Sequence, residues 1–351
     1  MKRFLFVSIF LLLASVAVFT LAYSWLNDQV FDGTASPSNI IQKFEMKEGD
    51  GSTEIGENLE KEGLIKNKNF FYFYVWKTKA ANFLQAGTYE LAPNMTIGQM
   101  VEKFSNGDVI VETLKLTIPE GYTNKKIVNA LRSKKPSIAD EFENIVNCKC
   151  LNRKACSCDV FSKKYDFLRN IPQGIDMEGY LFPDTYFIDG EEAGATMASK
   201  FLNNFNKKIN QGLKDEIAFQ ERSLHDVVTL ASIIEREVKT DKDRRLVSGI
   251  FRKRLDDKFP LQSCATLAYF LNVDKPQFSY EDTQCDSLYN TYINPGLPPG
   301  PISNPGFASI RASIFPQKSD FYYFLSNSKT EEIIYSKTFD EHQQRKAENG
   351  L

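Results

Sequence analysis

The feature that most limits how this chain can fold is an uncharged run close to its first residue. Lys2 and Arg3 are followed by residues 4–26, which carry no charged side chain. A helix needs about 20 apolar residues to cross the hydrocarbon core of a bilayer, so this run is long enough. The positive-inside bias predicts that the two basic residues stay in the cytoplasm and that Trp25 lies at the opposite headgroup region. We therefore predict a transmembrane anchor over 1–28, with the rest of the chain outside the cytoplasm.

A cleaved signal peptide is the alternative to an anchor. Its apolar region would be about 7 to 15 residues long and would end in an Ala-x-Ala-like cleavage site. The uncharged run here is longer, and no convincing site follows it. The sequence thus favours an uncleaved, single-pass membrane protein.

The remaining length and composition indicate a folded body of two lobes. The chain has 351 residues, of which 42% are hydrophobic and 25% charged, as in globular proteins. Its net charge is -2, and its Lys and Arg residues are spread along the sequence. This distribution gives no electrostatic footprint for DNA or RNA, so a nucleic-acid partner is not expected.

Patterns along the chain predict an α+β protein with a linker at 29–43, a small α/β subdomain at 44–108 and a larger mixed α/β domain at 109–351. The small subdomain should contain helices at 52–62 and 96–104 and a strand at 87–91. For the larger domain we predict strands at 109–118, 321–326 and 333–336 and helices at 123–132, 193–209, 224–239 and 307–314.

The larger domain contains six cysteines. Cys148, Cys150, Cys156 and Cys158 form a C-x-C-x5-C-x-C cluster, which we interpret as an insertion near 147–159. An even number of cysteines outside the cytoplasm favours disulfides, although a small metal knuckle is the alternative. The spacing differs from the usual C-x2-C zinc pattern, so the sequence favours a disulfide-stapled insertion without a metal.

The helix predicted at 224–239 has the clearest period outside the anchor. Its apolar residues share one stripe: Val227, Ala231, Ile234 and Val238. Glu235 lies at one rim of this stripe and would be partly desolvated, the environment that keeps a general acid protonated near neutral pH. Glu237 lies at the opposite rim, so the period does not choose between the two glutamates. The structural alternative is that both are solvated residues at the edges of a helix.

Two segments that follow carry side chains suited to sugars. Gln262 offers a neutral amide that could hold hydroxyl groups. The segment 289–306 is rich in proline and glycine, so it should form an ordered loop without helix or strand. Its Tyr289, Asn290 and Tyr292 would suit a carbohydrate groove, because aromatic faces meet apolar sugar faces and amides meet hydroxyls. A structural loop packed by its own aromatic residues is the alternative.

These segments together resemble the endolytic murein transglycosylase family, also called YceG-like. The motifs that carry the resemblance appear in order: Thr117-Ile-Pro-Glu-Gly-Tyr, Glu178-Gly-Tyr-Leu-Phe-Pro-Asp-Thr-Tyr, Leu230-Ala-Ser-Ile-Ile-Glu-Arg-Glu, Pro260-Leu-Gln-Ser, Tyr289-Asn-Thr-Tyr, Gly296-Leu-Pro-Pro-Gly-Pro-Ile-Ser-Asn-Pro-Gly and Phe339-Asp-Glu-His. They cover most of residues 110–345.

The resemblance implies both an activity and its residues. It implies a membrane-anchored lytic transglycosylase with a LysM-like first subdomain, which cleaves the MurNAc–GlcNAc bond of peptidoglycan and leaves a 1,6-anhydro-MurNAc end. Glu235 would be its catalytic acid and base, with Gln262, Tyr289, Asn290 and Tyr292 around the substrate and no metal or organic cofactor. The body would lie outside the bacterial inner (plasma) membrane, beside peptidoglycan synthases, and would end growing strands.

Two departures and two rival functions accompany this resemblance. The family usually reads Leu-Gln-Ser-Asp-Pro-Thr where this chain has Leu261-Gln-Ser-Cys-Ala-Thr, so Cys264 and Ala265 replace an acid and a proline; Cys264 could instead pair with Cys285. One rival is a non-catalytic peptidoglycan-binding or scaffold protein. The other is a conventional hydrolase, which uses two carboxylates and would recruit a further one such as Glu178 or Asp184.

Overall fold

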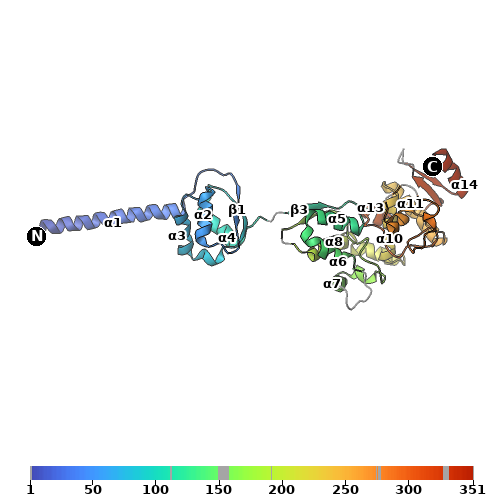
Figure 1. Ribbon diagram of the computed structural model, residues 1–351, viewed down its shortest axis with the longest axis horizontal. Helices are drawn as coiled ribbons and strands as arrows, with labels where there is room; N and C mark the ends of the chain where they lie inside the picture. Colours follow the sequence, from blue (N-terminus) through green and yellow to red (C-terminus); the bar gives the residue numbers. More distant parts are fainter. Residues whose placement is uncertain are drawn as a thin grey trace. The chain divides into compact units, whose positions relative to one another are not determined.

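A computed structural model describes residues 2–110, 113–148, 158–190, 192–273, 275, 278–326 and 332–350. The described chain forms two compact units, residues 1–112 and 113–351. Figure 1 shows their helices and strands, which confirm the mixed α/β character predicted from the sequence.

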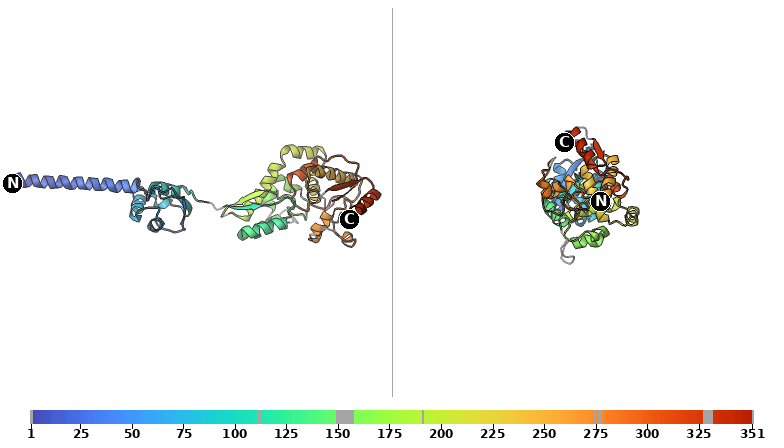
Figure 2. Two further views of the ribbon diagram at one scale, coloured as in Figure 1. Left: turned by 90° about the horizontal axis from the view of Figure 1, so that it is seen from above. Right: turned by 90° about the vertical axis from the view of Figure 1, so that its right-hand side faces the viewer.

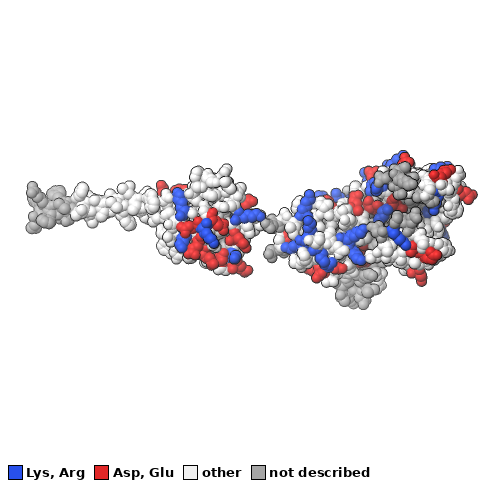
Figure 3. Space-filling view, turned by 45° about the horizontal axis from the view of Figure 1, so that its top comes forward, with Lys and Arg blue, Asp and Glu red and all other residues white. Residues whose placement is uncertain are grey.

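The first unit begins with one continuous helix, α1 (Lys2–Phe31), drawn in blue in Figure 2. Within it, Phe10–Phe31 is long and apolar enough to cross a membrane. Its described side chains before Asp28 carry no charge, and in Figure 3 this stretch has no red or blue atoms. Near its end, Phe31 packs against Tyr74, with ring centroids 5.0 Å apart. The helix is therefore consistent with a single-pass anchor.

The rest of the first unit is a small sheet with helices packed on it. Strands β1 (Gln42–Met46) and β2 (Gly87–Leu91) pair in antiparallel fashion, and α2 (Ser52–Lys61), α3 (Lys68–Thr78) and the 3₁₀ turn η1 (Ala80–Phe83) lie between them in sequence. Helix α4 (Ile97–Asn106) follows, and Thr96 and Gln99 form a capping box at its start. The core of this unit includes Phe44, Phe71, Tyr89, Leu91 and Phe104.

The first half of the second unit packs helices against a two-stranded sheet. Strand β3 (Leu114–Thr117) pairs in antiparallel fashion with β4 (Thr185–Ile188). The other elements of this half are α5 (Asn124–Lys134), α6 (Pro136–Val146), α7 (Cys158–Lys164), the 3₁₀ turn η2 (Asp166–Asn170), α8 (Gly194–Lys208) and α9 (Gln211–Phe219). The core combines aliphatic residues with several large aromatic ones, among them Phe142, Phe167, Tyr180, Phe201 and Phe205.

The second half is built around α10 (Leu224–Glu237), which packs against α13 (Phe307–Ile314) and α11 (Asp241–Asp256). Its outer elements are α12 (Cys264–Leu271), the 3₁₀ turn η3 (Asp282–Gln284), the antiparallel strands β5 (Tyr323–Ser326) and β6 (Ile333–Ser336), and α14 (Phe339–Glu348). Buried residues of α10 and α11, such as Ile233 and Phe251, join the two helices in one cluster.

Most predicted elements are present, and one is much shorter than expected. The helices predicted at 52–62, 123–132 and 224–239 correspond to α2, α5 and α10. Within the described part of 109–118, the regular strand is β3, where Leu114–Thr117 pairs with β4. Alternation along the sequence reports a possible strand, whereas pairing decides where the strand begins.

Candidate active site

Helix α10 is tied to the proline-rich loop through serine side chains. Ser223 caps the helix by accepting a hydrogen bond from the amide of Asp226 at 3.0 Å. The hydroxyl of Ser232 accepts the amide of Ile302 at 2.9 Å, and the hydroxyl of Ser303 donates to the carbonyl of Ser232 at 3.1 Å. These groups are buried, so the bonds fix the second half of α10 relative to the loop.

Glu235 lies near the C-terminal end of α10, and its side chain is 6% exposed. Its Oε1 accepts a hydrogen bond from Nη2 of Arg244 at 3.1 Å, and its Oε2 accepts one from the amide of Gly306 at 2.9 Å. The expected shielding of this side chain from water is observed. Its two donors are partners that suit an ionised carboxylate. Neither partner was predicted, because both come from segments that follow α10 in the chain.

A second carboxyl group, from Glu120, lies beside Glu235. Its Oε2 is 3.9 Å from Nη2 of Arg244, and its side chain is 51% exposed. A Cβ added to Gly306 would come within 1.9 Å of Oε1 of Glu120, so the carboxyl group lies against the glycine whose amide binds Glu235. Burial raises the pKa of Glu120, and the charge of Glu235 raises it further, while Arg244 opposes the shift. Our sequence reasoning missed this residue, although it lies in one of the motifs that carry the resemblance.

Glu237, the other glutamate of the helix, occupies a different environment. Its carboxyl group accepts hydrogen bonds from the hydroxyl of Ser263 and from the backbone of Ala265. Burial raises the pKa of Glu237. These bonds fix the first turn of α12, so Glu237 stabilises the fold at this point. The structure thus separates two glutamates that the helical period left equivalent.

The segment around Gln262 is hydrogen-bonded to the loop that contains Tyr289 and Tyr292. The amide of Gln262 donates to the carbonyl of Thr291 at 3.0 Å, and the amide of Ser263 donates to the hydroxyl of Thr291 at 3.0 Å. Gln262 is exposed and has a φ of 51°, in the left-handed region that few residues other than glycine adopt. Such conformations are often found at functional sites.

The possible pairing of Cys264 with Cys285 is wrong. Both are free thiols. The Sγ of Cys264 lies 3.0 Å from the hydroxyl of Tyr292, whereas the thiol of Cys285 donates to the carbonyl of Glu281 at 3.7 Å. Each sulfur has a local partner, and the loop is held by other bonds.

Asn290 is one of the residues that hold this loop. It is fully buried, and its Nδ2 donates to the carbonyls of Thr283 and Cys285 at 3.0 and 2.8 Å. Its Oδ1 accepts the amide of Tyr292 at 3.0 Å. The sequence suggested that this amide meets sugar hydroxyls. In this structure its nitrogen and its oxygen are both hydrogen-bonded to backbone groups instead. The reason is that a loop without helix or strand must satisfy its own polar backbone groups.

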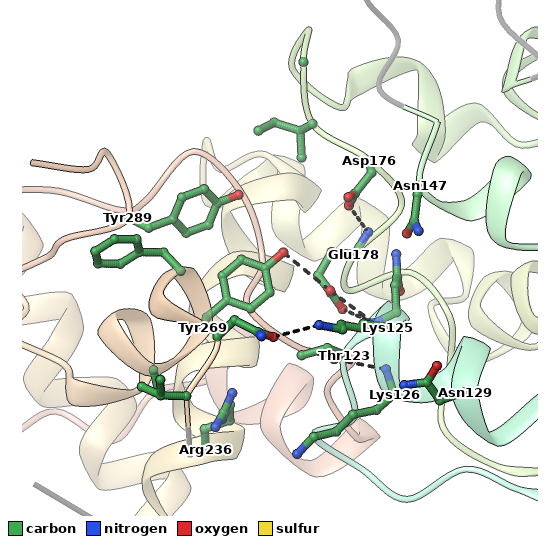
Figure 4. Close-up of a pocket in the computed structure, with 17 residues that line it drawn as sticks. Thr123, Lys125, Lys126, Asn129, Asn147, Asp176, Glu178, Arg236, Tyr269 and Tyr289 are labelled. Atoms are coloured by element: carbon green, nitrogen blue, oxygen red, sulfur yellow. Dashed lines mark hydrogen bonds between the residues drawn. The ribbon is translucent and has the colours of Figure 1, made fainter. Parts of the chain in front are cut away.

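A cavity of about 760 Å³ begins next to these residues, and Figure 4 shows its lining. Tyr269 and Tyr289 lie on one side, with ring centroids 5.3 Å apart. Cations and carboxyl groups also line it: Lys125, Lys126, Arg236, Asp176 and Glu178. Arg236 directly follows Glu235 in the chain. The cavity therefore offers aromatic faces and polar groups, and Arg236 links its lining to Glu235, which is not itself a lining residue.

Two further carboxyl groups, proposed for a hydrolase, have structural partners instead. Glu178 is buried, accepts the amide of Asn124 at 3.0 Å and accepts Nδ2 of Asn304 at 2.9 Å. Burial raises its pKa well above the ordinary value. Asp184 accepts Nδ2 of Asn204 at 3.0 Å, and this bond lowers its pKa. Neither carboxyl group hydrogen-bonds to Glu235 within the described part of the chain.

Substitution of Glu178 separates the two roles it could have. Glutamine should leave the free energy of unfolding within about 1 kcal/mol of the native value, because its oxygen can accept from Asn124 and Asn304 while its nitrogen faces Tyr269. Alanine should destabilise the fold by about 1–3 kcal/mol, since buried donors lose their partner. Denaturant unfolding measures both effects. Loss of cleavage by a stable Glu178→Gln variant would instead assign this carboxyl a catalytic role.

The same variant has a pH signature. Because the pKa of Glu178 is raised in the folded state, its contribution to stability is fully present below the pKa of the unfolded chain and is lost as pH rises through the folded value. The Glu178→Gln variant should therefore become more stable relative to the native chain as the pH increases.

The cysteine cluster lies mostly outside the described residues. Cys148 is disulfide-bonded, which agrees with the disulfides expected for this cluster. The side chains of Cys150, Cys156 and Cys158 fall outside the description. Within the described ranges, no group of three or more His, Cys, Asp or Glu residues is placed to hold a metal ion.

Comparison with known proteins places this chain in a family. The family model described as YceG-like matches residues 44–348. The chain is 33% identical over 317 residues to a Bacillus subtilis protein named endolytic murein transglycosylase, with coverage of 88% of this chain and 85% of that protein. A Streptococcus pneumoniae protein of the same name is 30% identical over 322 residues, which are 86% of this chain but 57% of the relative.

A solved structure supports the same assignment. It is a crystal structure of a putative YceG-like protein from Listeria monocytogenes, with 33% sequence identity and a TM-score of 0.58. The match covers 87% of this chain and 99% of the other. The resemblance inferred from the motifs is confirmed, and this chain belongs to the YceG-like family.

Proposed function

We propose that this chain is an endolytic lytic transglycosylase of peptidoglycan, which cleaves the MurNAc–GlcNAc bond and leaves a 1,6-anhydro-MurNAc end. The observation that carries the proposal is the setting of Glu235. Its carboxyl group is shielded from water and held by two donors, and the next residue, Arg236, lines the aromatic-containing cavity. The names of the relatives support the substrate class, since both are called endolytic murein transglycosylases.

In the proposed reaction Glu235 acts twice. It first gives a proton to the glycosidic oxygen as the bond to C1 of MurNAc breaks. It then takes the proton of the MurNAc 6-hydroxyl as that oxygen closes on C1. Positioned proton transfer contributes about 10²–10⁴ in rate, so stabilisation of the oxocarbenium-like charge must add to it. The amide of Gly306 and the guanidinium of Arg244 keep the carboxyl oriented throughout.

The predicted substrate residues take different parts in this proposal. Tyr289 lines the cavity and would contact the glycan through its ring. Gln262 is exposed and Tyr292 is half-buried, and both would contact sugar units next to the one that Tyr289 contacts. Asn290 would act indirectly, since it holds the loop that carries the tyrosines.

In this proposal the parts of the chain outside the catalytic site also have roles. Helix α1 would anchor the protein in the plasma membrane, with the rest of the first unit and the whole second unit outside the cytoplasm. The first unit, with its strand–helix–helix–strand order, would be LysM-like and would bind glycan. The enzyme would act on strands beside the peptidoglycan synthases and would end their growth.

The decisive experiment examines the sugar end that is left by cleavage. Purified sacculi are digested with the full chain in detergent, and the released fragments are analysed by mass spectrometry. We expect 1,6-anhydro-MurNAc ends. These are about 18 Da lighter than reducing ends, because hydrolysis adds one water and the transglycosylase reaction does not. Reducing ends would indicate a hydrolase, and the absence of new ends would indicate a protein that only binds glycan.

A further inference from the structure

The first step of the proposed reaction needs a proton that the hydrogen bonds of Glu235 do not explain. One oxygen of Glu235 faces the guanidinium of Arg244, and the other faces the amide of Gly306. Both groups are donors and neither accepts a proton from the carboxyl group. A second group that can carry a proton lies close by: the carboxyl of Glu120, which shares Arg244 and lies against Gly306.

We propose that Glu120 and Glu235 work as a dyad that holds a single proton, with Glu120 as the positioning residue that keeps this proton available to Glu235. The inference rests on the proposed function and deepens it. Two carboxyl groups close to one cation do not ionise independently, and a pair with one proton is the usual result. The environments differ, since Glu235 has two donors and Glu120 is half-exposed with one distant cation.

The charged groups around Glu120 favour this division. The carboxylate of Glu235 on α10 and that of Asp241 on α11 repel a charge on Glu120, while Arg244 on α11 attracts it. Burial also opposes ionisation of Glu120 and has the largest effect. Together they raise the pKa of Glu120, so it is the member of the dyad that retains a proton more readily than an ordinary glutamate.

The dyad neither gains nor loses a proton over one turnover. In the resting site Glu120 carries the proton, which passes to Glu235 when the glycan excludes water. Glu235 gives it to the glycosidic oxygen, and the C1–O bond breaks. The 6-hydroxyl then forms its bond to C1 and returns its proton to Glu235. The dyad therefore begins and ends each turnover with one proton, and no other reactant is required.

Two substitutions test the dyad in different ways. Glu120→Gln removes the second titrating group. Gly306→Ala keeps both carboxyl groups but places a methyl group where Glu120 now lies, within 1.9 Å of Oε1. The backbone of Gly306, at φ -72° and ψ 167°, is open to alanine, and its amide stays available to Glu235. Since Glu120 is half-exposed, its side chain can swing into water.

Both variants should show the same kinetic signature. At neutral pH we expect kcat to fall by at least about 10-fold while KM changes by less than about 2-fold, because Glu120 acts through Glu235 rather than on the sugar. The alkaline limit of the pH–kcat profile should move to lower pH by about one unit, since the proton is no longer held between two carboxyl groups.

Asp241→Asn is the matched control. Asp241 also pairs with Arg244, at 3.2 Å, but it is 84% exposed and does not contact Gly306 in any bond described. This variant removes a carboxyl group from the same guanidinium and should leave the pH profile within about 0.3 units of the native one, as expected for a solvated pair. Equal shifts in Asp241→Asn and Glu120→Gln would overturn the dyad, as would a native profile in Glu120→Gln. A native chain that releases no fragments would refute the proposed function itself and the dyad with it.

Discussion

Glutamine in place of Glu235 should lower the release of peptidoglycan fragments by at least about 100-fold, the lower bound for loss of a positioned acid and base. The amide is nearly isosteric, and its oxygen can still accept the amide of Gly306. It can neither give nor take a proton during the reaction. Full-chain protein in detergent, sacculi as substrate and mass spectrometry of the fragments provide the measurement.

The matched control for this variant is Glu237→Gln, the same change two residues further along α10. Its carboxyl group accepts from Ser263 and Ala265 and contacts neither Arg244 nor Gly306 in the bonds described. We expect a loss of stability of about 1–3 kcal/mol, because the new NH₂ group faces a backbone donor. Cleavage per folded molecule should persist. If Glu237→Gln abolished cleavage and Glu235→Gln did not, the roles of the two glutamates would be reversed.

Alanine in place of Gly249 should destabilise the second unit, although Gly249 lies within helix α11. In an open helix this change would stabilise by up to about 1 kcal/mol. Here the added Cβ would lie 1.9 Å from the carbonyl oxygen of Gln317 and 3.0 Å from its carbonyl carbon. Both atoms belong to the backbone, so α11 or the segment after α13 must move, at a cost of about 1–3 kcal/mol or more.

Thermal unfolding measures this effect, and a fall of several degrees in Tm is expected, since about 1 kcal/mol corresponds to about 2–4 °C for a unit of this size. Gly212→Ala in α9 is the control, because its new Cβ would meet only the side chain of Asn210, at an ordinary 3.5 Å. That variant should be as stable as the native chain or slightly more stable. A stable Gly249→Ala variant would show that α11 and its neighbour separate easily.

Local patterns predicted the elements of this chain well where one face is buried. The period of α10 and the alternation of β2 gave their positions, because burial imposes the repeat on the sequence. The same pattern placed Glu235 at the rim of the apolar stripe, and its side chain is 6% exposed. The limits of β3 escaped prediction because its partner, β4, lies far away in the chain.

The partners of Glu235 escaped prediction for a related reason. Arg244, Gly306 and Glu120 come from three separate segments, and no local repeat records that they meet. For Asn290 the residue type suggested sugar, but the type does not say whether an amide faces a groove or its own backbone. Burial in the folded chain made that choice.

The cluster around Arg244 has an excess of acid: Glu120, Glu235 and Asp241 all pair with this one guanidinium, at 3.9, 3.1 and 3.2 Å. Even with one proton bound, three carboxyl groups and one cation leave a local charge of about -1. A sugar ring that becomes positive during bond cleavage would enter a field that already favours it. Ring analogues with a protonated nitrogen would meet the same field, whereas anionic wall polymers would be repelled from this cluster.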